Sequence, residues 1–184
     1  MILWNRFKYV LSPQFDIYTE VSKTVRGKVA DIGFGTGFGT HLLTVHAKEV
    51  IAYDIDEGGI NFAEKVFPLP KLRFTYGDIN KGIDSTGFDY VVMIDVIEHM
   101  RYDKRVLENI KKMLNGNGTL IMSTPNRLSR YRKSVNHVRE YAPKELEALC
   151  SKVFINVSLR DHQLEPLASQ YQNPLVVVCR NKGN

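Results

Sequence analysis

Two hydrophobic periods alternate along this chain. Short apolar runs that suit strands occupy residues 28–32, 49–54, 72–76, 88–95 and 119–123. Between these runs, apolar residues return every three or four positions, which is the spacing of one helix face. Strands that alternate with helices in this way predict a doubly wound, mostly parallel α/β sheet with helices on both faces.

The two ends of the chain depart from this alternation. Residues 1–26 are predicted to be a covering segment followed by a helix, which Ser12 and Pro13 are suited to open. Near the other end, strands are predicted over 153–159 and 175–179, joined by an irregular loop. So short a connection favours a hairpin, and the last strand should therefore run antiparallel. The whole pattern predicts a seven-stranded sheet in a single domain, 1–184.

A glycine-rich stretch joins the first predicted strand to the next helix. Asp31 ends the apolar run, and Gly33, Gly35, Gly37 and Gly39 alternate after it. Glycines permit positive φ and let a ligand lie against the backbone, and helix amides suit an electron-rich ligand. A flexible surface loop is the alternative interpretation. The dinucleotide fingerprint Gly-x-Gly-x-x-Gly fails here, which disfavours a nicotinamide oxidoreductase.

The segment Asp31-Ile-Gly-Phe-Gly-Thr-Gly37 resembles the first motif of the class I S-adenosylmethionine (SAM) methyltransferases, Asp-x-Gly-x-Gly-x-Gly. The seven predicted strands and the antiparallel last strand also resemble the Rossmann-like sheet of that family. The resemblance implies that SAM is the cofactor. It further implies that Asp31 lies near the methionine amine and that Gly33, Gly35 and Gly37 pass beside the cofactor.

Acids at the ends of other predicted strands extend this expected site. Asp54, followed by Ile55, ends the second strand, where a carboxylate can accept hydrogen bonds from ribose hydroxyls. Capping of the helix that begins near residue 57 is the alternative role for Asp54. The resemblance implies that Asp78 and Ile79 contact adenine. Asp95, at the end of the central strand, completes the predicted cofactor-binding set.

Two histidines are the candidate catalytic residues. Methyl transfer requires the acceptor's lone pair to be held behind the methyl carbon, and a hydroxyl acceptor also benefits from a base. His99 follows the central strand, and imidazoles titrate near neutrality. His137 lies in a His-x-Arg-Glu-Tyr stretch that resembles one in small-molecule and glycan-modifying methyltransferases, where it shapes the acceptor side. The alternative is that His99 and Glu98 hold a loop together.

A metal site is a further alternative for the same region. Asp95, Glu98, His99 and His137 offer the oxygen and nitrogen ligands that Mg²⁺ or Mn²⁺ could take. This set resembles that of the RNA 3′-terminal 2′-O-methyltransferases, which use two glutamates and two histidines. Here Asp95 replaces one glutamate, and the longer His-rich segment of that family is missing. A metal-free site is therefore the prediction, and a metal-dependent RNA 2′-O-methyltransferase stays an alternative.

Charge points to the kind of acceptor. The chain carries a formal net charge of +5 and a sequence pI near 9.1, which suggests an acidic partner. The loop 126–139 contains no acid but five basic residues: Arg127, Arg130, Arg132, Lys133 and Arg139. Arginines bind phosphate through paired donors, so a phosphate-bearing acceptor, RNA included, is a candidate partner. A solvated loop is the alternative.

Composition excludes several other classes. With 43% hydrophobic and 24% charged residues in 184, the chain can bury a real core. No apolar run reaches the roughly 18 residues needed to cross a bilayer, so a soluble cytoplasmic protein is expected. Cys150 and Cys179 are too few for a disulfide framework or a zinc cluster. The reading is a SAM-dependent methyltransferase acting on oxygen, with a non-catalytic SAM- or nucleic-acid-binding module as the alternative.

Overall fold

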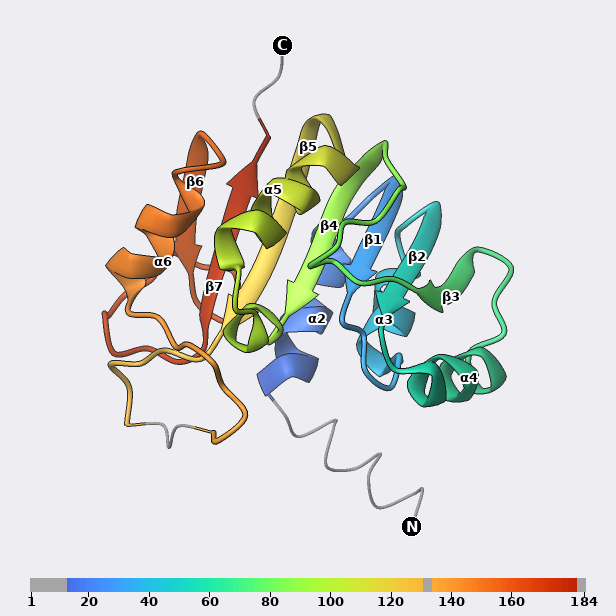
Figure 1. The fold of residues 1–184 in the computed structure, drawn as a ribbon, viewed down its shortest axis with the longest axis horizontal. Helices are drawn as coiled ribbons and strands as arrows, with labels where there is room; N and C mark the ends of the chain where they lie inside the picture. The colour runs from blue at the N-terminus through green and yellow to red at the C-terminus, as the bar shows by residue number, and fades with distance from the viewer. Residues whose placement is uncertain (1–12, 131–133, 182–184) are drawn as a thin grey trace.

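The computed structural model describes residues 13–130 and 134–181, and a seven-stranded sheet forms the centre of this part (Figure 1). The strand order is β3-β2-β1-β4-β5-β7-β6. The strands are β1 Lys28–Ile32, β2 Glu49–Asp54, β3 Leu72–Tyr76, β4 Phe88–Ile94, β5 Leu114–Thr124, β6 Asn156–Arg160 and β7 Leu175–Arg180.

Strand direction follows the prediction. β1 pairs in parallel with β2 and β4, and the same holds for β2 with β3 and β4 with β5. β7 runs antiparallel to both of its neighbours, β5 and β6, and its arrow points the opposite way in Figure 1. The expected Rossmann-like sheet with an antiparallel last strand is thus confirmed.

Helices cover both faces of the sheet. They are α2 Pro13–Thr24, α3 Phe38–Leu43, α4 Glu57–Val66, the 3₁₀ helix η1 Ile97–His99, α5 Asp103–Met113 and α6 Pro143–Cys150. In Figure 1, α5 and α6 lie in front of the sheet, and α2 and α3 lie behind it. Successive strand residues point alternately to the two faces of the sheet. Met93 packs in the core under α5 and α6, and Val92 packs in the core under α2, α3 and α4.

Two predicted boundaries were wrong. β6 begins at Asn156, not at residue 153, because the backbone amides of Val153 and Phe154 bond the Cys150 carbonyl and finish α6. Both side chains are buried, so their apolar character reflects core packing. β5 begins at Leu114, not at residue 119, so residues 115–118 lie within the strand. There the pairing jumps from Phe88–Leu114 to Tyr90–Thr119, which marks an irregularity in the strand.

The carboxyl ends of β1, β2, β3 and β4 meet at one edge of the sheet, the lower edge in Figure 1. This is where ligands bind in open α/β sheets. The predicted covering segment, residues 1–12, lies outside the described residues. Among the helices that the structure describes, none combines the length and the apolar character that crossing a membrane requires.

Candidate cofactor and acceptor site

The glycine loop has the backbone that its sequence predicts. Gly33, Gly35 and Gly37 have φ values of +72°, +59° and +79°. Their φ angles lie in the left-handed region that favours glycine. The Gly33 amide donates to the Tyr53 carbonyl at 2.7 Å, which ties the loop to β2. Gly37 directly precedes the first turn of α3.

These three glycines differ in what surrounds them. A Cβ atom on Gly33 would lie 2.5 Å from a methyl group of Val96, and one on Gly37 would lie 3.0 Å from Ala63. Packing therefore requires glycine at both positions. A Cβ on Gly35 would meet nothing within 4 Å. Gly35 thus borders open space, where a ligand could lie directly against the backbone.

Asp54 links β2 to this loop. Its carboxylate accepts hydrogen bonds from the Gly35 amide at 3.0 Å, from the Ile55 amide at 2.7 Å and from the Asp56 amide at 3.1 Å. Capping is not its role, because Asp56 is the N-cap of α4 and accepts from the Gly58 amide. The Asp54 carboxylate is partly exposed beside the open side of Gly35.

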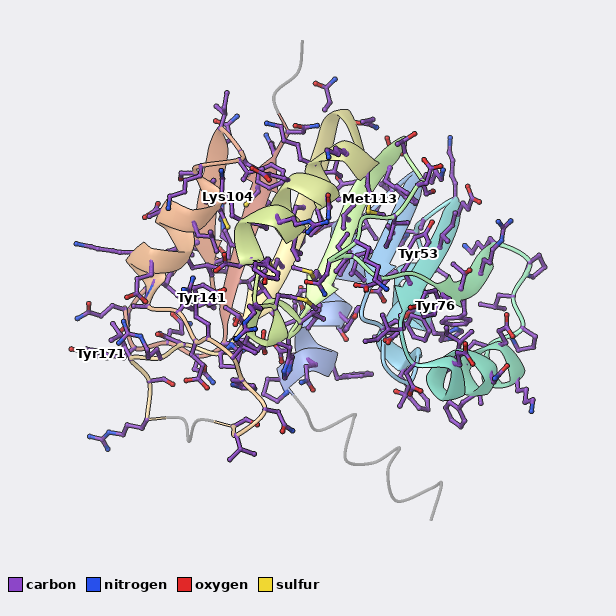
Figure 2. The ribbon with its side chains drawn as sticks, viewed as in Figure 1. Tyr53, Tyr76, Lys104, Met113, Tyr141 and Tyr171 are labelled. Atoms are coloured by element: carbon purple, nitrogen blue, oxygen red, sulfur yellow. The ribbon has the colours of Figure 1, made fainter. Side chains whose placement is uncertain are left out.

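Of the two residues expected near adenine, Asp78 is partly exposed and Ile79 is buried. Asp78 lines a cavity of about 490 Å³, together with Tyr53 and Tyr76, which Figure 2 labels on β2 and β3. Ile79 is 3% exposed, and its carbonyl accepts from Asn109. Its side chain is therefore committed to the core. Ile55, 63% exposed, offers far more apolar surface to a flat ring.

Asp31 is fully buried. It accepts hydrogen bonds from the Tyr18 hydroxyl at 3.0 Å and from the Thr40 hydroxyl at 2.7 Å. Burial raises the pKa of the Asp31 carboxyl to about 7, although both hydroxyl donors lower it. Asp31 is thus held at the base of the glycine loop by protein groups.

Asp95 ends β4 in a strained conformation. Its φ of +53° is rare for a residue other than glycine, and such strain gathers at functional sites. Hydrogen bonds hold it there: the Ser123 hydroxyl donates to the carboxylate at 2.6 Å, and the Gln14 side-chain amide donates to it at 2.9 Å. The carboxylate of Asp95 is therefore fixed at the centre of the binding edge.

His99 and His137 come together, as their candidate role requires. Their rings meet edge to face with centroids 5.1 Å apart. His99 Nδ1 lies 3.0 Å from the Asn136 carbonyl, and His137 Nδ1 lies 2.6 Å from a Glu140 carboxylate oxygen. A carbonyl can only accept, so we infer that His99 carries its proton on Nδ1 and its lone pair on Nε2.

Glu98 lies beside His99 and His137. It is 1% exposed and accepts from the Thr124 hydroxyl, and burial with the nearby Asp95 charge raises the pKa of its carboxyl to about 8. Its own carbonyl accepts from the Val138 and Arg139 amides, which holds the segment around His137 against η1. The interpretation that Glu98 and His99 fasten a loop agrees with these bonds.

The structure brings together only some of the four metal ligands suggested by the sequence. Ligand atoms of Glu98, His99 and His137 lie within 4.8 Å of one another. Asp95 does not belong to that group. The structure thus brings together three of the four side chains.

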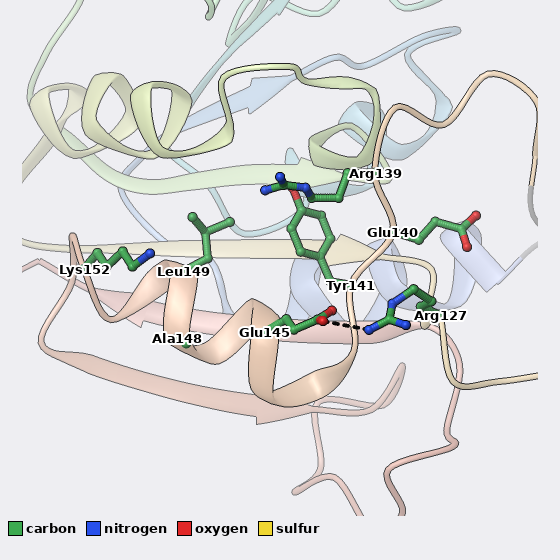
Figure 3. Close-up of a pocket in the computed structure, with 8 residues that line it drawn as sticks. All are labelled: Arg127, Arg139, Glu140, Tyr141, Glu145, Ala148, Leu149 and Lys152. Carbon is green, nitrogen blue, oxygen red and sulfur yellow. Dashed lines mark hydrogen bonds and ion pairs between the residues drawn. The ribbon is translucent and has the colours of Figure 1, made fainter.

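The basic loop is less cationic than its sequence indicates. Arg127 pairs with Glu145 at 2.7 Å, and Arg139 pairs with Asp103 at 2.6 Å. Both arginines line a cavity of about 420 Å³ beside α6 (Figure 3). Because carboxylates neutralise both guanidinium groups, these two arginines bind phosphate less readily. Arg132 and Lys133 lie outside the described residues.

Sequence reasoning missed several residues of this edge. They are Gln14, Tyr18, Thr40, Ser123 and Glu140, all of which hold one of the candidate residues by a side-chain hydrogen bond. Tyr18 carried a usable signal, because it is a polar-tipped residue on the apolar face of a helix. The others looked like ordinary polar residues.

Comparison with known proteins identifies the family. Residues 23–173 match the family model of a methyltransferase domain. The chain is 28% identical over 121 residues to a Mycobacterium tuberculosis protein named "probable S-adenosylmethionine-dependent methyltransferase". The match covers 65% of this chain and 43% of that protein. It is 28% identical over 123 residues to the ubiquinone biosynthesis O-methyltransferase of Coxiella burnetii, covering 65% and 53%. The chain spans about half the length of these curated relatives.

Solved structures share the fold. A TehB-like SAM-dependent methyltransferase from Corynebacterium glutamicum superposes with a TM-score of 0.74 at 20% identity, covering 97% of this chain and 94% of that one. The N-methyltransferase NodS from Bradyrhizobium japonicum, in complex with S-adenosyl-L-homocysteine (SAH), gives 0.70 at 17% identity, covering 91% and 85%.

The open side of Gly35 and the acid beside it fit the cofactor of this family. The match to the methyltransferase domain covers most of the chain and agrees with the seven-stranded sheet and the glycine motif. SAM is the cofactor of that family, and this chain therefore belongs to the class I SAM-dependent methyltransferases.

Proposed function

We propose that this chain transfers the methyl group of SAM to an oxygen atom of a small-molecule, glycan or phosphate-bearing acceptor, with His99 as the general base. The observation that carries the proposal is the hydrogen bond between His99 Nδ1 and the Asn136 carbonyl. It directs the basic Nε2 atom away from the loop. The O-methyltransferase named among the curated relatives supports oxygen, and the NodS N-methyltransferase makes an amine the competing acceptor.

In this proposal the cofactor lies along the glycine loop. Gly33, Gly35 and Gly37 allow the cofactor to lie close to the backbone. Asp54 accepts hydrogen bonds from the ribose hydroxyls. Asp78, with Ile79 behind it, and the exposed Ile55 face the adenine. Asp31 and Asp95 provide negative charge toward the methionine end.

SAM supplies an electrophilic methyl group on a sulfonium. The chain's own residues would hold the acceptor hydroxyl in line with that methyl group, which supplies much of the rate by orientation. His99 Nε2 would take the hydroxyl proton as the oxygen attacks. His137, fixed by Glu140, would form the wall against which the acceptor is placed.

The assignment of Asp54 predicts a loss of cofactor affinity. Asp54→Ala removes a charge-assisted acceptor and should weaken SAH binding by roughly 1.5 to 3 kcal/mol. Asp56→Ala is the matched control, because it removes the cap of α4 and leaves Asp54 in place. Calorimetric titration measures both. Equal SAH affinity in the parent and Asp54→Ala proteins would contradict the assignment.

The cluster of Glu98, His99 and His137 favours one second candidate, a metal-dependent RNA 2′-O-methyltransferase. One observation counts against it. Asp95, the fourth ligand suggested by the sequence, lies outside the cluster.

Transfer of labelled methyl groups tests both candidates. Phenolic, carboxylate, glycan, amine and RNA acceptors would be supplied with labelled SAM, with chelator, with Mn²⁺ and with neither. We expect transfer to a non-RNA oxygen acceptor that chelator leaves unchanged. Transfer to an RNA 3′ end that chelator abolishes and Mn²⁺ restores would establish the second candidate instead. Transfer confined to amines would overturn the assignment to oxygen.

A further inference from the structure

Gly39, the fourth of the alternating glycines after Asp31, has a different role from the other three. Gly39 lies in α3 and does not have the positive φ of Gly33, Gly35 and Gly37. A Cβ atom on Gly39 would overlap the aromatic ring of Tyr18. Packing, and not backbone conformation, therefore requires glycine at this position. Its absent side chain lets Tyr18 of α2 lie flat against the start of α3.

This close approach brings the Tyr18 hydroxyl to the end of β1. The hydroxyl lies 3.0 Å from one oxygen of Asp31 and 3.3 Å from the other. Thr40, the residue after Gly39, donates to the same carboxylate at 2.7 Å. Tyr18 is 4% exposed and Asp31 is fully buried. A buried ring with its hydroxyl on a carboxylate has a defined orientation, so Tyr18 does more than fill space.

Gln14 makes a similar contact one helical turn earlier. Residues four apart on a helix lie on the same face, so Gln14 and Tyr18 point in the same direction. The Gln14 side-chain amide donates to Asp95 at 2.9 Å, across 81 residues of sequence. β1 and β4 are neighbours in the sheet. One face of α2 thus holds the carboxylates that end two adjacent strands.

We propose that α2 is a positioning element of the methyl-donor site, in which Tyr18 and Gln14 fix the carboxylates of Asp31 and Asp95 toward the cationic methionine end of the cofactor. The inference rests on the proposed cofactor position along the glycine loop. Fixing the two acids before binding avoids the cost of ordering them afterwards. Tyr18 and Gln14 act through these acids and are not themselves catalytic.

The pH dependence of binding distinguishes positioning from simple packing. Four influences act on the Asp31 carboxyl: burial raises its pKa, Thr40 of α3 and Tyr18 of α2 lower it, and the charge of Asp54 on β2 raises it. Tyr18→Phe keeps the ring on Gly39 and removes one donor to the ionised carboxylate. The pKa of Asp31 must then rise further above about 7. Asp31 becomes more neutral near pH 7 and attracts the ammonium group that SAM and SAH share less strongly.

Calorimetric titration with SAH across pH tests this inference. We expect Tyr18→Phe to bind SAH about tenfold more weakly near neutral pH, with its binding curve displaced to higher pH. Gln14→Leu should also bind about tenfold more weakly. Because Gln14 is only partly buried, this variant keeps the proposal testable if Tyr18→Phe fails to fold. Glu20→Gln is the control, since Glu20 pairs with Lys23 on the exposed part of α2.

Two results would overturn the inference. If Asp54→Ala loses SAH affinity while Tyr18→Phe and Gln14→Leu keep both the affinity and the pH profile of the parent, α2 merely packs on the sheet. If Asp54→Ala also binds SAH like the parent, the cofactor position itself is wrong, and the role of α2 is lost with it.

Discussion

Replacing Gly35 by valine is expected to abolish SAH binding while the domain stays folded. Gly35 has a φ of +59° and no atom near its absent Cβ, so a side chain would project into the space assigned to the cofactor. Its amide also donates to Asp54, so a displaced loop would misplace the ribose acceptor as well. Titration with SAH, with circular dichroism to verify folding, measures the result.

Gly87 provides a matched control for this change. It has a φ of +78° and also has nothing within 4 Å of a Cβ atom, but it lies just before β4, at the opposite edge of the sheet. Gly87→Val therefore carries the same kind of backbone strain, without a side chain in the cofactor space. We expect it to bind SAH like the parent. A folded Gly35→Val protein that still binds SAH would remove the proposed site.

The second large effect is expected on turnover. His99→Ala should lower kcat by about 10²- to 10⁴-fold, the usual contribution of a general base, and should leave SAH affinity unchanged. Steady-state rates of methyl transfer test this once an acceptor is in hand.

His46→Ala is the control for removing an exposed imidazole. His46 follows α3 and is exposed, as His99 is. It should show the methyl-transfer rate of the parent. If His99→Ala also keeps the parent rate, then His99 only fastens the segment around Asn136, and orientation alone drives the transfer.

Local patterns explain how much of the fold was predictable. β2 was predicted with its observed bounds because a strand that is buried on both faces is apolar almost throughout, and β3 because its buried and exposed residues alternate. The positive φ of Gly33, Gly35 and Gly37 could also be anticipated, since glycine adopts this region without a steric cost. The start of β6 was not predictable. Val153 and Phe154 have the apolar character of strand residues, but they follow α6 and pack in the core.

The candidate site was predictable where it depends on strand ends. Asp54 and Asp95 follow apolar runs, and topology alone brings such residues to one edge. The contacts that hold them were not, because they join segments far apart in the chain. Asn136 reaches His99 across 37 residues, and Gln14 reaches Asp95 across 81. Such contacts depend on the paths of loops and on where α2 packs against the sheet. Neither can be predicted from a periodic pattern in the sequence.

A crystal structure of this chain with SAH tests the account most directly. The account predicts that the ribose hydroxyls lie within hydrogen-bond distance of the Asp54 carboxylate and that the homocysteine backbone passes Gly35. The side of the sulfur that carries the methyl group in SAM should face His99. SAH bound elsewhere, for example in the cavity lined by Arg127, Tyr141 and Leu149, with the space beside Gly35 left empty, would contradict it.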